Sequence, residues 1–511
     1  MTGGGLYVLI SYGTQNVIMS GNPQMTYYYK IFKRYSHFAM ENVSIALDGP
    51  NLLSVDGKIQ LHAKIQRIGD LMSDMFLTFT IPDIYSKYVA PNPTSSVNRK
   101  QYEFQWVKAL GAAIIDSVEF FIGANSIQKF DGTYLYSKAL LEYDTVTFQK
   151  WCILVGNTSE LNNPSTGAFQ ANSTFGPAYP TVVPQGTGQQ NNRPSIPGQT
   201  IHVPLNFWFT DATFQALPLI ALQYQDCSVT ITLNPIQSLY TILDYLGNRV
   251  APQYTSISVN LNNPTYAITR EQTTSIQNFL TDVGFTTPLS PWPLNPILQC
   301  TFVYLSDEER ITFASRPLTY VFPQVRVLPL GPVTQTSQTF DLEVSNPISR
   351  FIFITRRSDW QQRNDFVNFT NWYSYPFAPN NPGSLVTTNT PSSGLLIANS
   401  QKDIIKNVRV LVNGNEIQEA KPTDFLTKIY PFRYTMGSAN AEIPIYTWAI
   451  TSSKTQPSGS LNASRITNFQ LEANFYNLPA NSNYAYNFDL YVESINFLVI
   501  VSGSGAPKYV I

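Results

Sequence analysis

The segment IIDSVEFFIGANSIQK, residues 114–129, returns in altered form as IIKNVRVLVNGNEIQE at residues 404–419. The two segments align without a gap at an offset of 290, and six of their sixteen positions are identical. Each contains two apolar stretches separated by a short turn rich in Gly and Asn, the pattern of a β-hairpin. Its occurrence in both halves of the chain predicts two copies of one structural unit.

Further repeats support this interpretation. They occur in the same order along the chain: HVPLNFWFT at 202–210 with EIPIYTWAI at 442–450, and, more weakly, DLMSDMFLTFTI at 70–81 with NPISRFIFITRR at 346–357. Trp208 and Trp448 stand at matched positions, where we expect both to lie on strands and to anchor the core. Matched, ordered repeats indicate two similar domains in tandem.

The spacing of the repeats locates an insertion in the first half. The offset falls from 290 to 240 between the hairpin and the tryptophan segment, so about 50 residues are added in the first half. Residues 155–200 are rich in Asn, Gln, Pro, Gly, Ser and Thr and show no periodic pattern. We expect them to form a long exposed loop, with a shorter one at residues 374–394 in the second half.

Composition favours β structure over helix. Charged residues make up only 13% of the 511 residues, whereas aromatic residues also make up 13%. Long surface helices need Glu, Lys and Arg, and aromatic residues favour strands. The helical candidates are short, at residues 26–35 and 305–314, the second with Ser306 as N-cap. Many short strands with Pro and Gly turns predict an all-β chain of two sandwiches or jelly rolls.

Charge and cysteine content exclude several function classes. The formal net charge is −1 and no basic tail occurs, which argues against direct nucleic-acid binding. The three cysteines lie far apart, which predicts reduced thiols. No apolar run reaches the length of a membrane-spanning helix, and the N-terminus lacks a signal-peptide pattern.

The segment QPSGSLNASRITNFQL, residues 456–471, raises the question of chemistry. A serine nucleophile needs a nearby base, but the histidines are remote in sequence, and a phosphate loop needs a Gly-Lys-Ser or Gly-Lys-Thr ending that is absent. We interpret the segment as a turn between strands, in which these residues fix the backbone: Pro457, Gly459, Asn462 and Ser464. Arg465 is predicted to be a buried tie or a contact between copies of the chain.

Other polar groups receive structural interpretations. The acidic run Asp307–Glu309 is expected to be a solvated helix start, and the cations of residues 30–34 to border an apolar helix face. Asn157 and Asn172 are glycan acceptor candidates because both lie in the predicted long loop. No catalytic residue, metal ligand or cofactor site is predicted.

Four segments, spread over nearly the whole chain, resemble one known family. They are residues 13–43 with Gly21, Asn22 and Pro23, residues 203–233, residues 304–314, and QPSGSLNASR at 456–465. In order and content they are similar to the major capsid proteins of nucleocytoplasmic large DNA viruses, including algal viruses, iridoviruses and giant viruses. Thr447–Ala449 departs from many members, and residues 155–200 match nothing in the family pattern.

The resemblance implies an architecture and a function. It implies two tandem eight-stranded jelly rolls, which we expect at residues 26–237 and 238–511 after an N-terminal arm at 1–25. Family members form homotrimeric, pseudo-hexagonal capsomers that tile an icosahedral capsid. The implied partners are further copies of the chain, neighbouring capsomers and minor capsid proteins. The resemblance does not decide whether a membrane beneath the shell is a further partner. No direct contact with nucleic acid is expected.

The resemblance also implies where the protein is found and that it is not an enzyme. The expected location is the virion shell, assembled in the host cytoplasm. Two alternatives stay open, a minor capsid or vertex paralogue and a jelly-roll virion protein that binds carbohydrate. A glycan-processing enzyme is a third class, but it requires a pair of converging carboxylates that the sequence does not identify.

Overall fold

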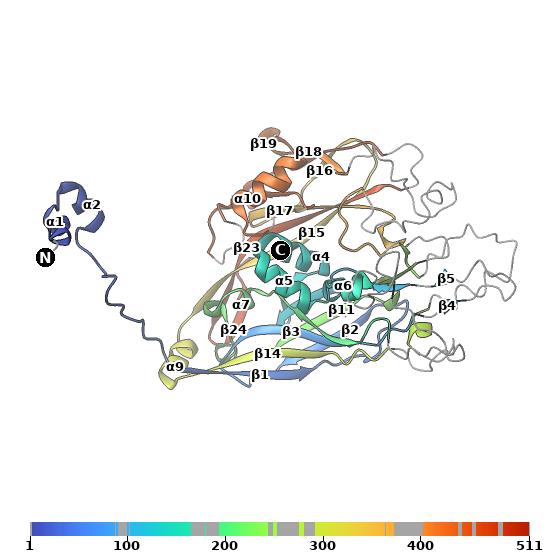
Figure 1. Ribbon diagram of the computed structural model, residues 1–511, viewed down its shortest axis with the longest axis horizontal. Coiled ribbons are helices and arrows are strands. Elements are labelled where there is room, and N and C mark those ends of the chain that lie inside the picture. Colours follow the sequence, from blue (N-terminus) through green and yellow to red (C-terminus); the bar gives the residue numbers. More distant parts are fainter. Residues whose placement is uncertain are drawn as a thin grey trace.

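The computed structural model shows a body of β-sheets and an N-terminal arm that leads away from it (Figure 1). The described residues are 3–86, 88–89, 100–101, 103–164, 179, 194–243, 249–252, 275–280, 292–362, 364–371, 402–437, 442–451, 456–478 and 484–509. The arm carries two short helices, α1 (Gly4–Ile10) and α2 (Thr14–Ser20).

The first half of the body is a jelly roll of two antiparallel sheets. One sheet contains, in spatial order, β1 (Phe38–Ala46), β14 (Ile297–Leu305), β3 (Leu71–Ile81) and β9 (Gln199–Pro204), with β10 (Leu217–Pro218) also paired to β3. The facing sheet contains β2 (Ile59–Ile65), β11 (Cys227–Leu233), β7 (Ile115–Ile122) and β8 (Asn125–Phe130). The first and last strands of the roll are therefore neighbours, as a jelly roll requires.

The second half repeats this arrangement strand for strand. One sheet is β15 (Leu318–Val333), β23 (Tyr486–Val501), β17 (Pro347–Arg357) and β20 (Ile445–Thr447), with β21 (Leu461–Asn462) and β24 (Ser504–Pro507) added at its margins. The other is β16 (Ser337–Asp341), β22 (Phe469–Phe475), β18 (Ile405–Val412) and β19 (Asn415–Pro422). The predicted fold class, a double jelly roll, is confirmed.

The sequence repeats fall on equivalent strands of the two rolls. The repeated hairpin forms β7–β8 in the first roll and β18–β19 in the second. The weaker repeat forms β3 and β17, and the tryptophan repeat contains the end of β9 and the whole of β20. Because side chains alternate between the faces of a strand, β2, β11 and β22 bury every second residue between the sheets of their own roll.

Short elements connect these strands. Two small sheets are formed by β4 (Tyr88–Val89) with β5 (Lys100–Gln101), and by β6 (Phe104–Trp106), β12 (Tyr240–Leu243) and β13 (Arg249–Val250). The short helices are α3 (Leu110–Ala113), α7 (Trp208–Asp211), η2 (Thr213–Gln215), η3 (Leu219–Ala221), η4 (Ile236–Ser238), η5 (Ile276–Phe279), η6 (Trp360–Gln362) and η9 (Ala463–Arg465). The three cysteines are all free thiols.

The predicted domain boundary at residue 237 does not match the strand pairing. β14 lies beyond that boundary, yet it pairs with β1 and β3 and completes the first roll. The change of roll falls between β14 and β15, where α9 (Asp307–Ser315) stands. This helix was predicted, and Ser306 is its N-cap residue, although the serine side chain makes no capping bond.

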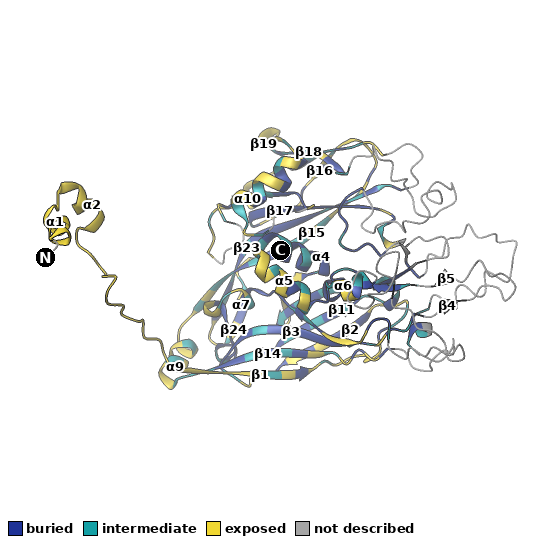
Figure 2. Ribbon diagram, in the orientation of Figure 1, coloured by how far each residue is buried: buried dark blue, intermediate teal, exposed yellow. Residues whose placement is uncertain are grey.

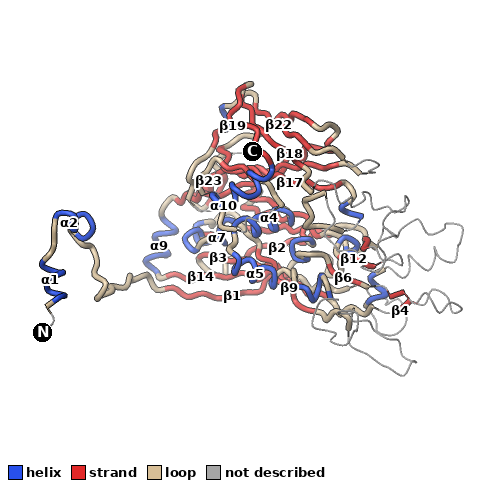
Figure 3. The backbone as a smooth tube through the Cα atoms, turned by 45° about the horizontal axis from the view of Figure 1, so that its top comes forward, coloured by secondary structure: helices blue, strands red, loops and turns tan. Residues whose placement is uncertain are grey.

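The arm and the connections also differ from the sequence predictions. The arm continues to residue 37 without the helix expected at 26–35, because no neighbouring surface covers its apolar side chains. Between β8 and β9 the chain forms α4 (Gly132–Glu142), α5 (Thr145–Leu154) and α6 (Ser159–Asn162), and between β19 and β20 the π-helix η8 (Phe425–Ile429) and α10 (Tyr430–Tyr434). Both views place α4, α5, α7 and α10 beside or between the strands of the two rolls (Figure 3).

The predicted loops are only partly described. Residues 155–164 are folded, with Val155 and Leu161 buried, so the first part of the predicted loop at 155–200 is not an exposed coil. Residues 374–394 lie outside the described residues.

Neither matched tryptophan lies on a strand. Trp208 opens α7, is fully buried, and packs edge-on against Phe120 and Phe209. Trp448 follows β20, is only partly buried, and packs edge-on against Phe351 and Tyr446. Both therefore pack on the cores of their rolls, but the surrounding residues enclose Trp208 more completely.

Replacement of the two tryptophans will separate these environments. Trp208→Ala is expected to lower the free energy of unfolding by about 3–5 kcal/mol, because it leaves a large cavity in a closed core. Trp448→Ala is expected to lower it by about 1–2 kcal/mol, because part of that side chain is already solvated. Chemical denaturation followed by circular dichroism measures both. Equal losses would contradict the assigned difference in burial.

Candidate functional site at the junction of the two rolls

A buried ionic network joins the two rolls. Arg350 on β17 is fully buried and donates two hydrogen bonds to Glu493 on β23, from Nε to Oε2 at 2.7 Å and from Nη2 to Oε1 at 2.6 Å. The same Nη2 donates to Glu142 Oε1 of α4 at 2.7 Å. Tyr134 of α4 donates its hydroxyl to Glu493 Oε1 at 2.7 Å. Two residues of the first roll thus bind an ion pair of the second.

The electrostatics of this network follow from its burial. Burial opposes the charge on Arg350, but the carboxylates of Glu493 and Glu142 raise its pKa above the ordinary value. Burial also raises the pKa of Glu142, against the opposing effect of Arg350, and it raises the pKa of Tyr134 with help from Glu493. At neutral pH the guanidinium stays charged and the phenol stays a donor, so the network retains its hydrogen bonds.

A second cluster lies on the same boundary. Asp131 caps α4 by accepting from Tyr134 N at 2.7 Å, and its other oxygen accepts from the hydroxyl of Tyr491 on β23 at 2.5 Å. Burial raises the pKa of Asp131, while these hydrogen bonds act in the opposite direction. Arg356 of β17 donates to Thr133 Oγ1 at 3.2 Å. The first turn of α4 is therefore fastened to two strands of the second roll.

Aromatic rings complete the surroundings of this second cluster. The Arg356 guanidinium lies 4.7 Å from the ring centroid of Trp360 and 4.9 Å from that of Phe369. Such cation–π contacts stabilise a buried cation whose charge is not matched by a close carboxylate. One turn after Tyr134 on the same face of α4, Lys138 donates to Asp211 of α7 at 3.0 Å.

The loop at residues 456–459 covers this junction. A cavity of about 60 Å³, room for a few water molecules, is lined by Tyr134, Lys138, Glu142, Asp211 and Glu493, and by loop residues 456–459. Pro457 and Gly459 are among the lining residues. The loop therefore lies over the ionic network and closes it on one side.

Local hydrogen bonds hold the loop as a turn. Ser458 Oγ accepts from Thr451 N and donates to Thr451 O, each at 3.0 Å. Asn462 Oδ1 accepts from Ser464 N at 3.2 Å and from the Ser464 hydroxyl at 2.6 Å. Gly459 has φ +148°, and a Cβ atom there would meet Trp448 O at 2.7 Å. These contacts support the interpretation of Asn462, Ser464 and Gly459 as turn residues.

Arg465 is not the buried tie that the sequence suggested. Its side chain, at the end of η9, is exposed, and a contact between copies of the chain stays a prediction for it. Arg350 on β17 is fully buried instead, and sequence reasoning missed it. A signal was present, since Arg350 interrupts the apolar run ISRFIFI of the repeat, and a cation inside a buried strand requires a partner.

The glycan candidates and the arm motif lie elsewhere. Asn157 is half-buried; its Oδ1 accepts from Ala109 N at 3.2 Å and from Asn162 Nδ2 at 3.0 Å, so it supports the fold rather than projecting freely. Asn172 lies outside the described residues. Gly21, Asn22 and Pro23 follow α2 in the exposed arm, where Gly21 N donates to Val17 O at 2.8 Å.

The two histidines that lie on strands make structural contacts, whereas His37 is exposed in the arm. His62 Nδ1 lies 3.3 Å from Thr230 Oγ1, and His202 Nδ1 lies 2.9 Å from Thr78 Oγ1, in both cases between paired strands. Asp307 at the start of α9 is exposed, as predicted for a solvated helix start. Within the described part of the chain, no three His, Cys, Asp or Glu side chains are placed to hold a metal ion, and no helix is long and apolar enough to cross a membrane.

Comparison with known proteins gives a consistent result. Residues 26–270 match the family model described as major capsid protein N-terminus, and residues 309–506 match that of the large eukaryotic DNA virus major capsid protein. The major capsid protein of Paramecium bursaria Chlorella virus 1 is 24% identical over 99% of both chains. That of Chrysochromulina ericina virus is 26% identical over 69% of this chain but only 57% of its own length.

A solved structure shows the same fold. The quasi-atomic model of the PBCV-1 virus capsid superposes with a TM-score of 0.64 at 18% identity, covering 95% of this chain and 100% of the other.

Arg350→Met will test the junction. Removal of the guanidinium leaves the buried Glu493 and Glu142 without their cation, so the free energy of unfolding is expected to fall by about 3–5 kcal/mol. Arg409→Met is the matched control, because Arg409 pairs with Glu472 on a solvated sheet face and its loss is expected to change stability little. Denaturant titration of both variants makes the comparison, and similar stabilities would contradict the role given to Arg350.

The loop can be tested at Gly459. Gly459→Ala is expected to destabilise the chain by about 1–3 kcal/mol, because it combines an unfavourable φ with a clash against Trp448 O. Gly414→Ala is the control: it also has a positive φ, +80°, but nothing lies within 4 Å of the added methyl group. Thermal unfolding should show the larger shift for Gly459→Ala. A larger shift for Gly414→Ala would show that backbone conformation alone decides the effect.

Proposed function

This chain belongs to the family of large eukaryotic DNA virus major capsid proteins, and we propose that three copies of it form the capsomer from which the viral shell is built. The observation that carries the proposal is the identical strand order of the two rolls. Three chains, each with two equivalent rolls, place six similar domains around one axis. Such a trimer can occupy a hexagonal position in a lattice. Closed cyclic symmetry limits the assembly to three chains.

The junction network supports this geometry. A pseudo-hexagon requires a fixed angle between the two rolls of each chain. If one roll rotated relative to the other, the six domains would no longer be evenly spaced around the axis. The bonds from Arg350, Tyr491 and Arg356 to the first roll restrain the angle at several points. A buried polar network specifies one arrangement, since every alternative leaves charges without partners.

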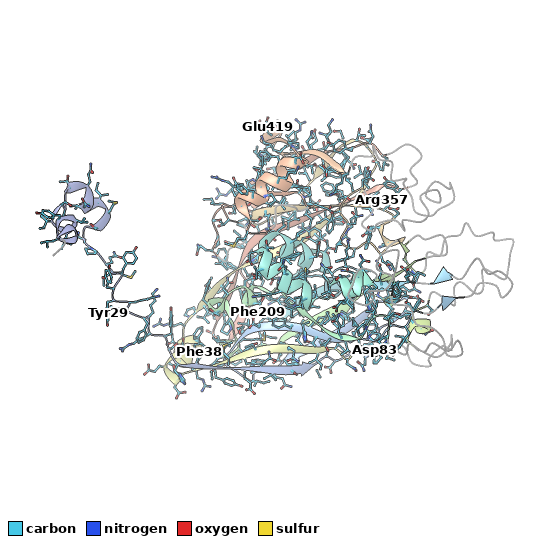
Figure 4. The ribbon with its side chains drawn as sticks, in the orientation of Figure 1. Tyr29, Phe38, Asp83, Phe209, Arg357 and Glu419 are labelled. Atoms are coloured by element: carbon cyan, nitrogen blue, oxygen red, sulfur yellow. The ribbon has the colours of Figure 1, made fainter. Side chains whose placement is uncertain are left out.

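The two ends of the body differ in a way that suits a shell. Tyr29 and Phe38 lie at one end of the molecule, and Asp83 and Arg357 lie at the opposite end (Figure 4). In the first roll the connections at the end with Phe38 are residues 66–70, 123–124 and 205–226, whereas those at the other end include the longer segments 82–114 and 131–198. We propose that the long connections face outward and that the arm faces the interior.

Apolar faces of equivalent helices suggest where the copies meet. α5 of the first roll exposes Val146 and Ile153, and the η8–α10 segment of the second roll exposes Ile429 and Phe432, which is 83% exposed. Both segments connect the fifth and sixth strands of their roll. In a ring of six similar rolls such equivalent faces are repeated around the axis, and exposed apolar side chains mark sites of association.

The remaining functional assignments follow from the same proposal. Weak contacts between capsomers are sufficient, because many act together, and a net charge of −1 limits repulsion between copies. Minor capsid proteins and a membrane beneath the shell are the proposed inner partners, and the host cytoplasm is the proposed site of assembly. The proposed role is structural and involves no catalysis.

The solution mass of the purified protein tests the trimer. The chain has a mass of 57.3 kDa, and light scattering on a sizing column is expected to give about three times that value, unchanged on dilution. A monomer at high concentration would contradict the homotrimer and would return attention to a minor capsid paralogue or a carbohydrate-binding virion protein.

The proposed contact between copies has its own pair of variants. Phe432→Gln is expected to shift the mass toward that of the single chain, because it removes an apolar group from the interface. Arg433→Gln is the control on the same helix, and it should leave the mass unchanged. Equal masses for both variants and the unaltered chain would exclude this face of α10 from the interface.

A further inference from the structure

The N-terminal arm, residues 3–37, exposes an unusual amount of apolar surface. Every residue of the arm is exposed, and the arm leads away from the body (Figure 2). These large apolar side chains are among those more than half exposed: Leu6, Tyr7, Val8, Leu9, Ile10, Tyr12, Val17, Ile18, Met19, Met25, Tyr27, Tyr28, Tyr29, Ile31, Phe32 and Tyr35. Apolar side chains are stabilised when they are removed from water, so the arm is expected to bind a surface that covers them.

The charges of the arm all have one sign. Lys30, Lys33 and Arg34 lie among the aromatic residues of YYYKIFKRY, residues 27–35, and no Asp or Glu occurs before Glu41. The rest of the chain therefore carries the compensating negative charge, since the formal total is −1. A surface that binds the arm must therefore accommodate aromatic rings and balance positive charges.

We propose that the arm is a membrane-surface anchor that adsorbs to anionic lipid on the inner side of the shell. Aromatic rings are favoured at the level of lipid headgroups, and Lys and Arg beside them reach the phosphates. α1 and α2 have seven residues each, far fewer than the roughly 20 needed to span a bilayer, so the arm lies in the interface. The inference rests on the proposed function, because the arm leaves the end of the body assigned to the interior.

Nucleic acid and a second copy of the chain fit the arm less well. Three cations would neutralise few phosphates, and stacking on bases does not cover the aliphatic residues of α1. A groove on another copy would need acidic groups to match the cations. A bilayer surface supplies apolar and anionic components together. Three arms in one trimer would act jointly, so the weak adsorption of a single arm is sufficient.

Vesicle flotation with the full chain tests the proposal. The trimer is mixed with vesicles of phosphatidylcholine alone or with vesicles that also contain phosphatidylserine, an anionic lipid of cytoplasmic leaflets. Binding is expected only to the anionic vesicles. The triple variant Lys30→Gln, Lys33→Gln, Arg34→Gln is expected to bind on the order of 100-fold more weakly, as three lost charges predict. The variant Tyr27→Ser, Tyr28→Ser, Tyr29→Ser, which retains every charge, should also bind more weakly.

The control is a triple substitution on the body, Lys58→Gln, Lys64→Gln, Lys129→Gln, whose lysines are exposed on the first roll. It should bind as the unaltered chain does. Light scattering on every sample measures the mass of the protein, so loss of the trimer can be told apart from loss of membrane binding. A trimer that binds neither vesicle type, or binds both equally, overturns the membrane anchor and leaves the capsomer intact. Arm variants that dissociate the trimer would assign the arm to a neighbouring copy, and tighter binding to duplex DNA than to vesicles would assign it to the genome.

Discussion

The structure depends on one buried arginine. Arg350 lies on the central strand β17 with no exposed surface, and its guanidinium binds a carboxylate of its own roll and another of the first roll. A buried charge is stable only if it is paired and hydrogen-bonded. Here Arg350 donates to Glu493 and Glu142, and the Tyr134 hydroxyl donates to Glu493. The two rolls therefore form one body with a defined relative position.

That constraint explains the placement of the other conspicuous elements. Helix α4 lies at the junction, where Asp131, Tyr134 and Glu142 bind the second roll. The loop at residues 456–459 closes the same region, so its Pro and Gly serve the junction and not catalysis. The parts that do not contribute to the junction, the arm above all, remain free to bind elsewhere, and this division suits a subunit that must be rigid in outline and adaptable at its inner face.

The sequence predicted some features and missed others for identifiable reasons. The hairpin repeat led directly to β7–β8 and β18–β19, because register and turn chemistry are local. The boundary at residue 237 was wrong, because β14 joins the first roll through pairing with strands more than 200 residues earlier, which no local pattern records. The strand positions predicted for Trp208 and Trp448 were wrong as well, since Trp208 begins α7 and Trp448 follows the end of β20.

The sequence alone determined that this protein contains two similar β-units, since hydrophobic alternation, hairpin turns and their repetition are properties of neighbouring residues. It also determined the family, through segments distributed along the chain. Only the tertiary structure decided that Arg350 and not Arg465 is buried, that α4 links the rolls, and that the arm is left uncovered. These features depend on which distant surfaces meet. Burial and the pairing of charges arise between segments separated in sequence, so they become visible only when the chain is folded.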